Sequence, residues 1–355
     1  IYTEFGTNNT KELGLDFGDT LNEDGTLSYR FTGLLRDGEL EYPFSENDEV
    51  FAMGSLQWRP TDATELTLIV DHLDRDYVPG SGGFPIGYDF DRSSVFYGEP
   101  EYNFRGTERT SVSLMATHDY GNGLKFSGNM RYSDGTDNFG YAYVSGSEGD
   151  TVNRSFFASE GSGDNFITDV HLSYDAIIGA ATSKTVIGLE YSQSDESDQR
   201  FFGGAPSVDL DNPVYTGAPD SVPIFADMDV ETEGKAVYFQ QEFNWSEKVI
   251  ASFGLRHDWI DVTETNNLAS TVTEDDISAT TGRLGLTYKI TPEIAVYGSF
   301  AQSVVPAGTG VAPEEGEQFE LGAKWRPAGT NALFAASVYD LSKTNIARTN
   351  PVTNL

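Results

Sequence analysis

Strict alternation of apolar and polar side chains is the feature that most constrains the fold of this 355-residue chain. Along residues 124–134, LKFSGNMRYSD, every second residue from Leu124 to Tyr132 is apolar or glycine, and the residues between them are polar. An extended strand places two such sets on its opposite faces. The pattern recurs along the chain with turns between the segments, so we predict an all-β fold of two-faced antiparallel strands.

Fourteen segments carry this pattern. Most are about the 9 to 11 residues that a tilted membrane-spanning strand needs, whereas a soluble sandwich favours strands of about 5 or 6 residues. The predicted strands are Lys11–Leu21, Leu27–Arg36, Asp48–Arg59, Glu65–Asp74, Arg109–Tyr120, Leu124–Asp134, Phe166–Ile178, Lys184–Asp195, Lys235–Trp245, Val249–Val262, Ala279–Ile290, Ile294–Val304, Gln318–Arg326 and Asn331–Leu341.

The connections between these strands alternate strictly between short and long. Short turns are predicted at residues 22–25, 60–64, 120–123, 179–182, 246–247, 291–293 and 327–330, and longer loops at about 37–47, 75–108, 135–165, 196–234, 263–278 and 305–317. Short periplasmic turns opposite long extracellular loops are typical of outer-membrane barrels. We therefore predict a transmembrane sheet of about 14 or 15 strands, with a soluble sandwich as the weaker alternative.

The composition suits a barrel wall, which needs apolar residues only at alternate positions because its lumen is wet. The chain is 38% hydrophobic with a mean hydropathy of -0.38, and no run approaches the roughly 18 apolar residues of a transmembrane helix. The absence of cysteine excludes thiol chemistry and zinc knuckles. The net charge of -34 argues against nucleic-acid binding and otherwise indicates a solvated surface.

The two ends of the sequence suggest a fragment. The chain begins at Ile1 with neither an initiator methionine nor a secretory signal, which an outer-membrane protein needs. It ends in the turn-like residues TNIARTNPVTNL rather than in a closing strand. We expect an N-terminal part and several closing strands to be missing.

Aromatic residues gather in two kinds of position. Trp and Tyr near strand ends favour an interfacial girdle over ordinary strand propensity, and these are Trp58, Tyr132, Trp245, Trp259, Tyr288 and Trp325. The long loops carry Phe84, Tyr88, Phe90, Phe96, Tyr97, Phe139, Tyr141, Tyr143, Phe156, Phe157, Phe201, Phe202 and Tyr215. A ligand vestibule lined by rings explains them, and packing of one loop on another is the alternative at each position.

Other kinds of site find little support. Four histidines, His72, His118, His171 and His257, lie on separate strands without metal-binding spacing. The glycine-rich GSGGFPIG at 80–87 is followed by no helix that could bind a phosphate. Carboxylate pairs arise by chance among 56 acidic residues. No nucleophile, base and oxyanion donor can be placed together, so we expect no cofactor, no bound metal and no enzymatic activity.

Several segments resemble the TonB-dependent siderophore receptors, and among them the ferrichrome-type hydroxamate receptors. The similarity runs in order over nearly the whole chain. Its strongest segments are GLDFGDTLNEDGTLSYRFTGLLRD (14–37), SLQWRPTDATELTL (55–68), FGLRHDW (253–259), RLGLTYKITPEIAVYGSFAQSVVP (283–306), EEGEQFELGAKWRP (314–327) and VYDLSKTNI (338–346).

The resemblance implies a 22-stranded barrel filled by an N-terminal plug that engages the TonB protein. Residues 1–355 would then be one partial barrel domain, without the plug and the closing strands. The implied function is binding and TonB-powered import of a ferric siderophore by a monomer that contacts outer-membrane lipid in a Gram-negative bacterium. Import of cobalamin or a carbohydrate is the nearest alternative. A passive channel, a surface adhesin and a soluble carbohydrate-binding sandwich are more distant ones.

The resemblance also implies ligand-binding residues, because loop aromatics hold the siderophore in ferrichrome-type receptors. The matching positions are Phe84 in GGFPIG, Tyr141 and Tyr143 in YAY, and Phe202 in RFFGG. If the chain stays extended, Tyr141 and Tyr143 face the same way and present one aromatic wall. Charged residues that alternate with apolar neighbours should point into the lumen and anchor the plug, and these are Arg30, Arg131, Arg256, Arg283 and Glu320.

Overall fold

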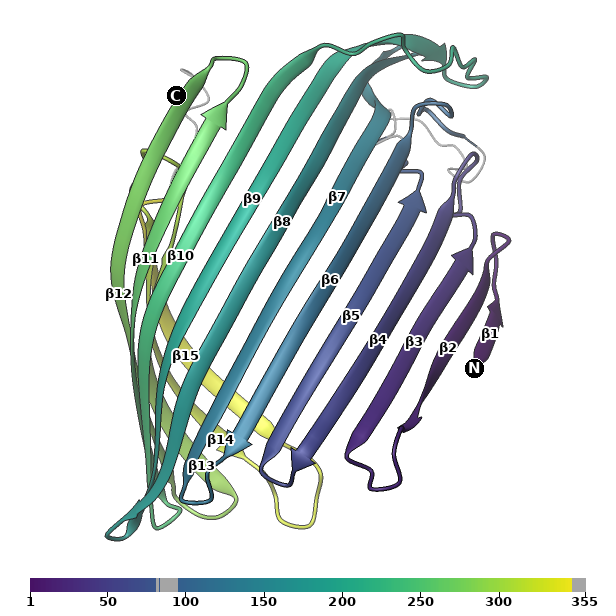
Figure 1. Ribbon diagram of the computed structural model, residues 1–355. Helices are drawn as coiled ribbons and strands as arrows, with labels where there is room; N and C mark the ends of the chain where they lie inside the picture. Colours follow the sequence, from purple (N-terminus) through teal and green to yellow (C-terminus); the bar gives the residue numbers. More distant parts are fainter. Residues whose placement is uncertain (81–82, 84–94, 347–355) are drawn as a thin grey trace.

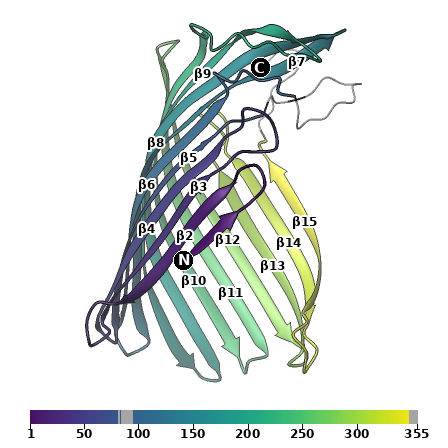
Figure 2. The same cartoon turned by 90° about the vertical axis from the view of Figure 1, so that its right-hand side faces the viewer.

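The computed structural model describes residues 1–80, 83 and 95–346, and within them fifteen antiparallel strands form one sheet in chain order. The sheet curls into a wall whose edge strands, β1 and β15, stay apart (Figures 1 and 2). The strands are β1 Tyr2–Phe5, β2 Lys11–Thr20, β3 Leu27–Asp37, β4 Asn47–Thr61, β5 Thr64–Tyr77, β6 Phe104–Asp119, β7 Leu124–Glu148, β8 Thr151–Ile178, β9 Ala181–Asp209, β10 Ile224–Trp245, β11 Val249–Asn266, β12 Thr271–Lys289, β13 Ile294–Val305, β14 Glu314–Trp325 and β15 Phe334–Thr344.

The all-β fold and the antiparallel order of consecutive strands agree with the prediction. All seven predicted short turns join consecutive strands at one end of the sheet, which is the lower end in Figure 1. The described residues form no helix long and apolar enough to cross a membrane.

The predicted long loops at 135–165, 196–234 and 263–278 are largely wrong, because the strands continue through them. Strand β8 has 28 residues and β9 has 29, far more than the roughly 10 that cross a bilayer. Only residues 149–150, 210–223 and 267–270 connect β7 to β12 at this end. The glycine, serine and aspartate content of these segments suggested loops. A strand that is surrounded by water can, however, stay hydrogen-bonded to its neighbouring strands even when the side chains on both of its faces are polar.

We call the part of β7, β8 and β9 above the predicted membrane segments the extension, namely residues 135–148, 151–165 and 196–209. Figure 2 shows these strands rising past the rest of the sheet and leaning over its open end. The candidate site lies on this extension.

The strand register assigns every side chain in the lower part of the sheet to one of two faces. One face is a band of exposed apolar side chains, such as Leu189 and Leu255. The register places all five residues predicted to point inward on the other face, as expected. The six predicted girdle aromatics lie on the apolar face, where each is between 41% and 48% exposed.

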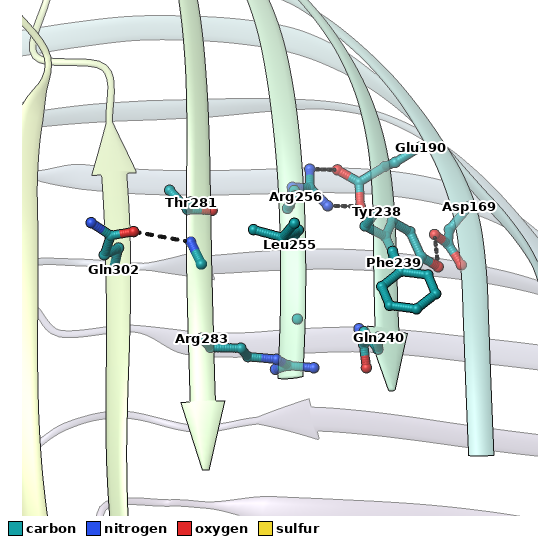
Figure 3. Close-up of a pocket in the computed structure, with 12 residues that line it drawn as sticks. Asp169, Glu190, Tyr238, Phe239, Gln240, Leu255, Arg256, Thr281, Arg283 and Gln302 are labelled. Atoms are coloured by element: carbon teal, nitrogen blue, oxygen red, sulfur yellow. Dashed lines mark hydrogen bonds and ion pairs between the residues drawn. The ribbon is translucent and has the colours of Figure 1, made fainter. Parts of the chain in front are cut away.

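Side chains from strands two apart meet on the polar face, which identifies it as the inner side of the curved sheet. Tyr238 of β10 crosses over Gly188 of β9 and donates its hydroxyl to Asp169 of β8 at 2.7 Å. Arg256 of β11 reaches Glu190 of β9 at 2.7 Å in the same way. These groups line a cavity of about 360 Å³ in the inner wall (Figure 3). Such charge-assisted bonds tie neighbouring strands together.

Candidate functional site

Six aromatic rings on the inner face of the extension and the adjoining end of β10 form a continuous surface, which we call the aromatic wall. Tyr141 and Tyr143 stack with ring centroids 5.0 Å apart, and Phe139 lies 4.8 Å from Tyr141. Phe157 of β8 connects this group, at 6.2 Å from Tyr141, to Phe225, which lies 6.4 Å from Phe202. The members are Phe139, Tyr141, Tyr143, Phe157, Phe202 and Phe225.

Strand periodicity explains why these rings share a face. Tyr141 pairs with Phe157 and Phe157 pairs with Phe202 across β7, β8 and β9, so their side chains point the same way. The β7–β8 register is unbroken between Arg131 and Tyr141, so the Tyr141 ring lies on the same face of β7 as Arg131, which points to the inner side of the barrel wall. The aromatic wall is therefore the upward continuation of the lumen surface.

A charged group marks the lower edge of the aromatic wall. Arg105 of β6 makes two hydrogen bonds to Asp137, at 3.0 and 2.9 Å, and its guanidinium lies 6.0 Å from the Phe139 ring centroid. It also donates to the Tyr77 hydroxyl at 3.2 Å. Asp137 therefore neutralises the one cationic side chain that lies over the Phe139 ring within the described residues.

The wall combines apolar ring faces with the phenolic hydroxyls of Tyr141 and Tyr143. Within the described residues, the hydroxyls of Tyr141 and Tyr143 have no hydrogen-bond partner. Burial first, and then the neighbouring Tyr143, raise the pKa of Tyr141 above its ordinary value of 10.0. Tyr141 is therefore protonated at neutral pH and can donate a hydrogen bond to an oxygen-rich ligand.

The opposite face of the extension is closed by the chain itself. Residues 95–103 of the β5–β6 connection and residues 210–217 of the β9–β10 connection pack on it. Tyr97 donates its hydroxyl to the Leu210 carbonyl at 2.8 Å, and Tyr215 donates to the Phe96 carbonyl at 2.9 Å. We call this the extension core, and its buried members are Phe96, Tyr97, Glu99, Val152, Arg154, Phe156, Val208 and Leu210.

Three of the four predicted site residues, Tyr141, Tyr143 and Phe202, come together in the aromatic wall. Phe84 lies outside the described residues. Sequence reasoning counted Phe139 and Phe157 among the loop aromatics without assigning them to the site, and it did not consider Phe225. The period-two pattern from Asp137 to Tyr143 could have added Phe139. Four other loop aromatics pack in or against the extension core, which fits the alternative explanation that loop aromatics pack on one another. These are Phe96, Tyr97, Phe156 and Tyr215.

A curved antiparallel sheet with an apolar outer band and a charged inner face is the wall of an outer-membrane β-barrel. Residues 55–355 match the family model described as TonB dependent receptor-like, beta-barrel. The chain belongs to this family, whose members are outer-membrane proteins of Gram-negative bacteria.

Known relatives agree with this assignment. The chain is 26% identical over 357 residues to the ferrioxamine B receptor of Salmonella typhimurium, covering 96% of this chain and 51% of that protein. It is 24% identical over 392 residues to the ferrichrome outer membrane transporter/phage receptor of Escherichia coli K12, covering 98% and 52%. The chain thus spans about half the length of the curated relatives it matches.

Solved structures share the fold. The ferripyoverdine receptor of Pseudomonas aeruginosa matches with a TM-score of 0.86 at 17% identity, covering 99% of this chain and 49% of that one. The siderophore receptor PiuA from Acinetobacter baumannii matches with a TM-score of 0.85 at 18% identity, covering 95% and 56%.

Proposed function

We propose that the protein containing this chain binds a ferric siderophore of the hydroxamate type at the cell surface and imports it with energy supplied through TonB. It acts as a receptor and transporter, not as an enzyme, and iron is part of its cargo. We assign the TonB contact and the plug to the half of the curated relatives that this chain does not cover. Tyr141, Tyr143 and Phe202 contact the ligand.

The aromatic wall is the observation that carries this proposal. A ferric trihydroxamate offers apolar linkers together with carbonyl and hydroxamate oxygens. Tyrosine rings can contact the linkers with their faces and donate from their hydroxyls to the oxygens at the same time. The names of the ferrioxamine and ferrichrome relatives support the same ligand class.

The test uses the full-length protein in nanodiscs, titrated with ferrichrome, ferrioxamine B, a ferric tricatecholate and cobalamin. We expect saturable binding of at least one ferric trihydroxamate and iron-limited growth on it of a receptor-deletion strain that carries the gene. Binding of cobalamin alone, or passive conductance without any binding, would contradict the proposal.

A further inference from the structure

The extension core contains an ion pair that is completely shielded from solvent. Arg154 Nη2 of β8 lies 3.2 Å from Glu99 Oε2, and both side chains are 0% exposed. Burying two charges is costly unless further hydrogen bonds satisfy them. The remaining contacts of this pair therefore matter more than the pair alone.

Those contacts connect three separate segments. Arg154 donates to the carbonyl of Gly98 at 2.6 Å and to that of Pro206 on β9 at 2.8 Å. Glu99 accepts from the backbone amides of Thr216 and Gly217 at 3.3 and 3.1 Å. The β5–β6 connection, β9 and the β9–β10 connection thus meet on one guanidinium and one carboxylate.

The pair sits directly behind the aromatic wall. Arg154 pairs with Val144, next to the Tyr143–Ser155 pair, and the strand register shifts just beyond it in both the β7–β8 and the β8–β9 pairing. Side chains alternate here between the two faces, so Arg154 and Phe156 are buried at the back while Phe157 lies in the wall. Strands that project this far from the rest of their sheet, as those of the extension do, need support on one face to keep a fixed twist.

We infer that Arg154 and Glu99 are positioning residues for ligand binding: they clamp the back of the extension and thereby hold the aromatic wall in its stacked arrangement. This inference rests on the proposed function. The pair touches no ligand, and it acts by keeping Tyr141, Tyr143 and Phe157 preorganised, which lowers the ordering cost of binding.

The experiment compares two double variants of the full-length receptor. Arg154→Met/Glu99→Met removes the clamp without leaving a lone buried charge. Lys11→Met/Asp37→Met removes a matched ion pair at the same end of the sheet, whose side chains are 62% and 74% exposed. For each variant, the affinity and dissociation rate of a ferric trihydroxamate that binds wild type are measured beside heat-modifiability of the barrel and protease protection of residues 95–103.

We expect the clamp variant to keep a heat-modifiable barrel and to bind about tenfold more weakly, mainly through faster dissociation. The control variant should match wild type. Adding Tyr141→Ala/Tyr143→Ala to the clamp variant should weaken binding less than it does in wild type, because the two changes affect the same surface. Wild-type affinity and dissociation rate in the clamp variant, with residues 95–103 released to protease, would overturn the inference.

Two further results keep the test decisive. If the clamp variant fails to insert, Arg154→Lys replaces it, because a lysine can face Glu99 but cannot reach both carbonyls with a planar fork. We then expect an intermediate affinity, and unchanged affinity would contradict the inference. Absence of trihydroxamate binding by wild type itself refutes the proposed function, and that result is distinct from any difference between the variants.

Discussion

The two faces of the extension are made by the same strands, yet they differ in what covers them. The back face carries residues such as Ala142, Val152 and Phe156, and segments from two connections close over it until these side chains are at most 3% exposed. The front face carries the larger rings, and Phe202 and Phe225 remain 47% and 52% exposed. This difference in exposure between the two faces is the reason why we propose the front face, and not the back face, as the binding surface.

Adjacent residues on β8 provide the sharpest test of this difference. Phe156→Ala opens a cavity in the extension core and should destabilise that region by about 3 to 5 kcal/mol. Phe157→Ala removes a wall ring and should cost less than about 1 kcal/mol in stability while weakening ligand binding. Hydrogen exchange of residues 95–103 and ligand titration of the full-length receptor measure the two effects. Equal losses of stability would erase the distinction between the faces.

The two stacked tyrosines should carry the largest share of affinity. Tyr141→Ala/Tyr143→Ala in the full-length receptor should weaken binding of a ferric trihydroxamate such as ferrichrome by about 2 to 4 kcal/mol, the usual cost of losing aromatic anchors. Arg131→Ala serves as the control, because Arg131 bonds Ser111 at 2.8 Å in the barrel wall and should change affinity only a few-fold. Affinity of the tyrosine variant within about threefold of wild type would mean that these rings only pack the extension.

Alternation alone predicted the strands, the turns and the inner face, because a period of two is a local property. It could not show where strands end in water, since a segment such as Asp134–Asp137 is polar enough for a loop yet continues β7 to Glu148. It also could not show that Phe156 is buried in the extension core while its neighbour Phe157 lies in the aromatic wall. The face that the β5–β6 connection covers depends on long-range contacts. One is the hydrogen bond that the Ala142 amide donates to the side-chain oxygen of Asn103, 39 residues away in the chain.

High pH should loosen the back face before the front. Burial raises the pKa of both Tyr97 and Tyr215 above the ordinary value of 10.0, and both hydroxyls donate to buried carbonyls. Their contribution is therefore complete below pH 10.0 and is lost as the pH rises through the higher folded values. Protease cleavage of residues 95–103 should increase above that pH, and Tyr97→Phe/Tyr215→Phe should remove most of this added dependence. Equal pH dependence in both proteins would contradict this assignment.

The smallest expected effect concerns ligand charge. The net charge of the chain is -34, and carboxylates such as Glu196 lie on the extension. A ferric trihydroxamate with a terminal ammonium should associate a few-fold faster at low salt than its N-acetylated form, and the difference should vanish at high salt. Stopped-flow fluorescence measures both rates. Faster association of the acetylated form would show that the acidic surface does not steer the ligand.

The most direct measurement is a structure of the full-length receptor with a bound ferric trihydroxamate, in which anomalous scattering locates the iron. We predict the iron in front of the aromatic wall, with the chelate touching Tyr141 and Tyr143 and with the Arg154–Glu99 pair unchanged behind them. Iron bound over the loops of β11–β15, with the aromatic wall empty, would contradict the account.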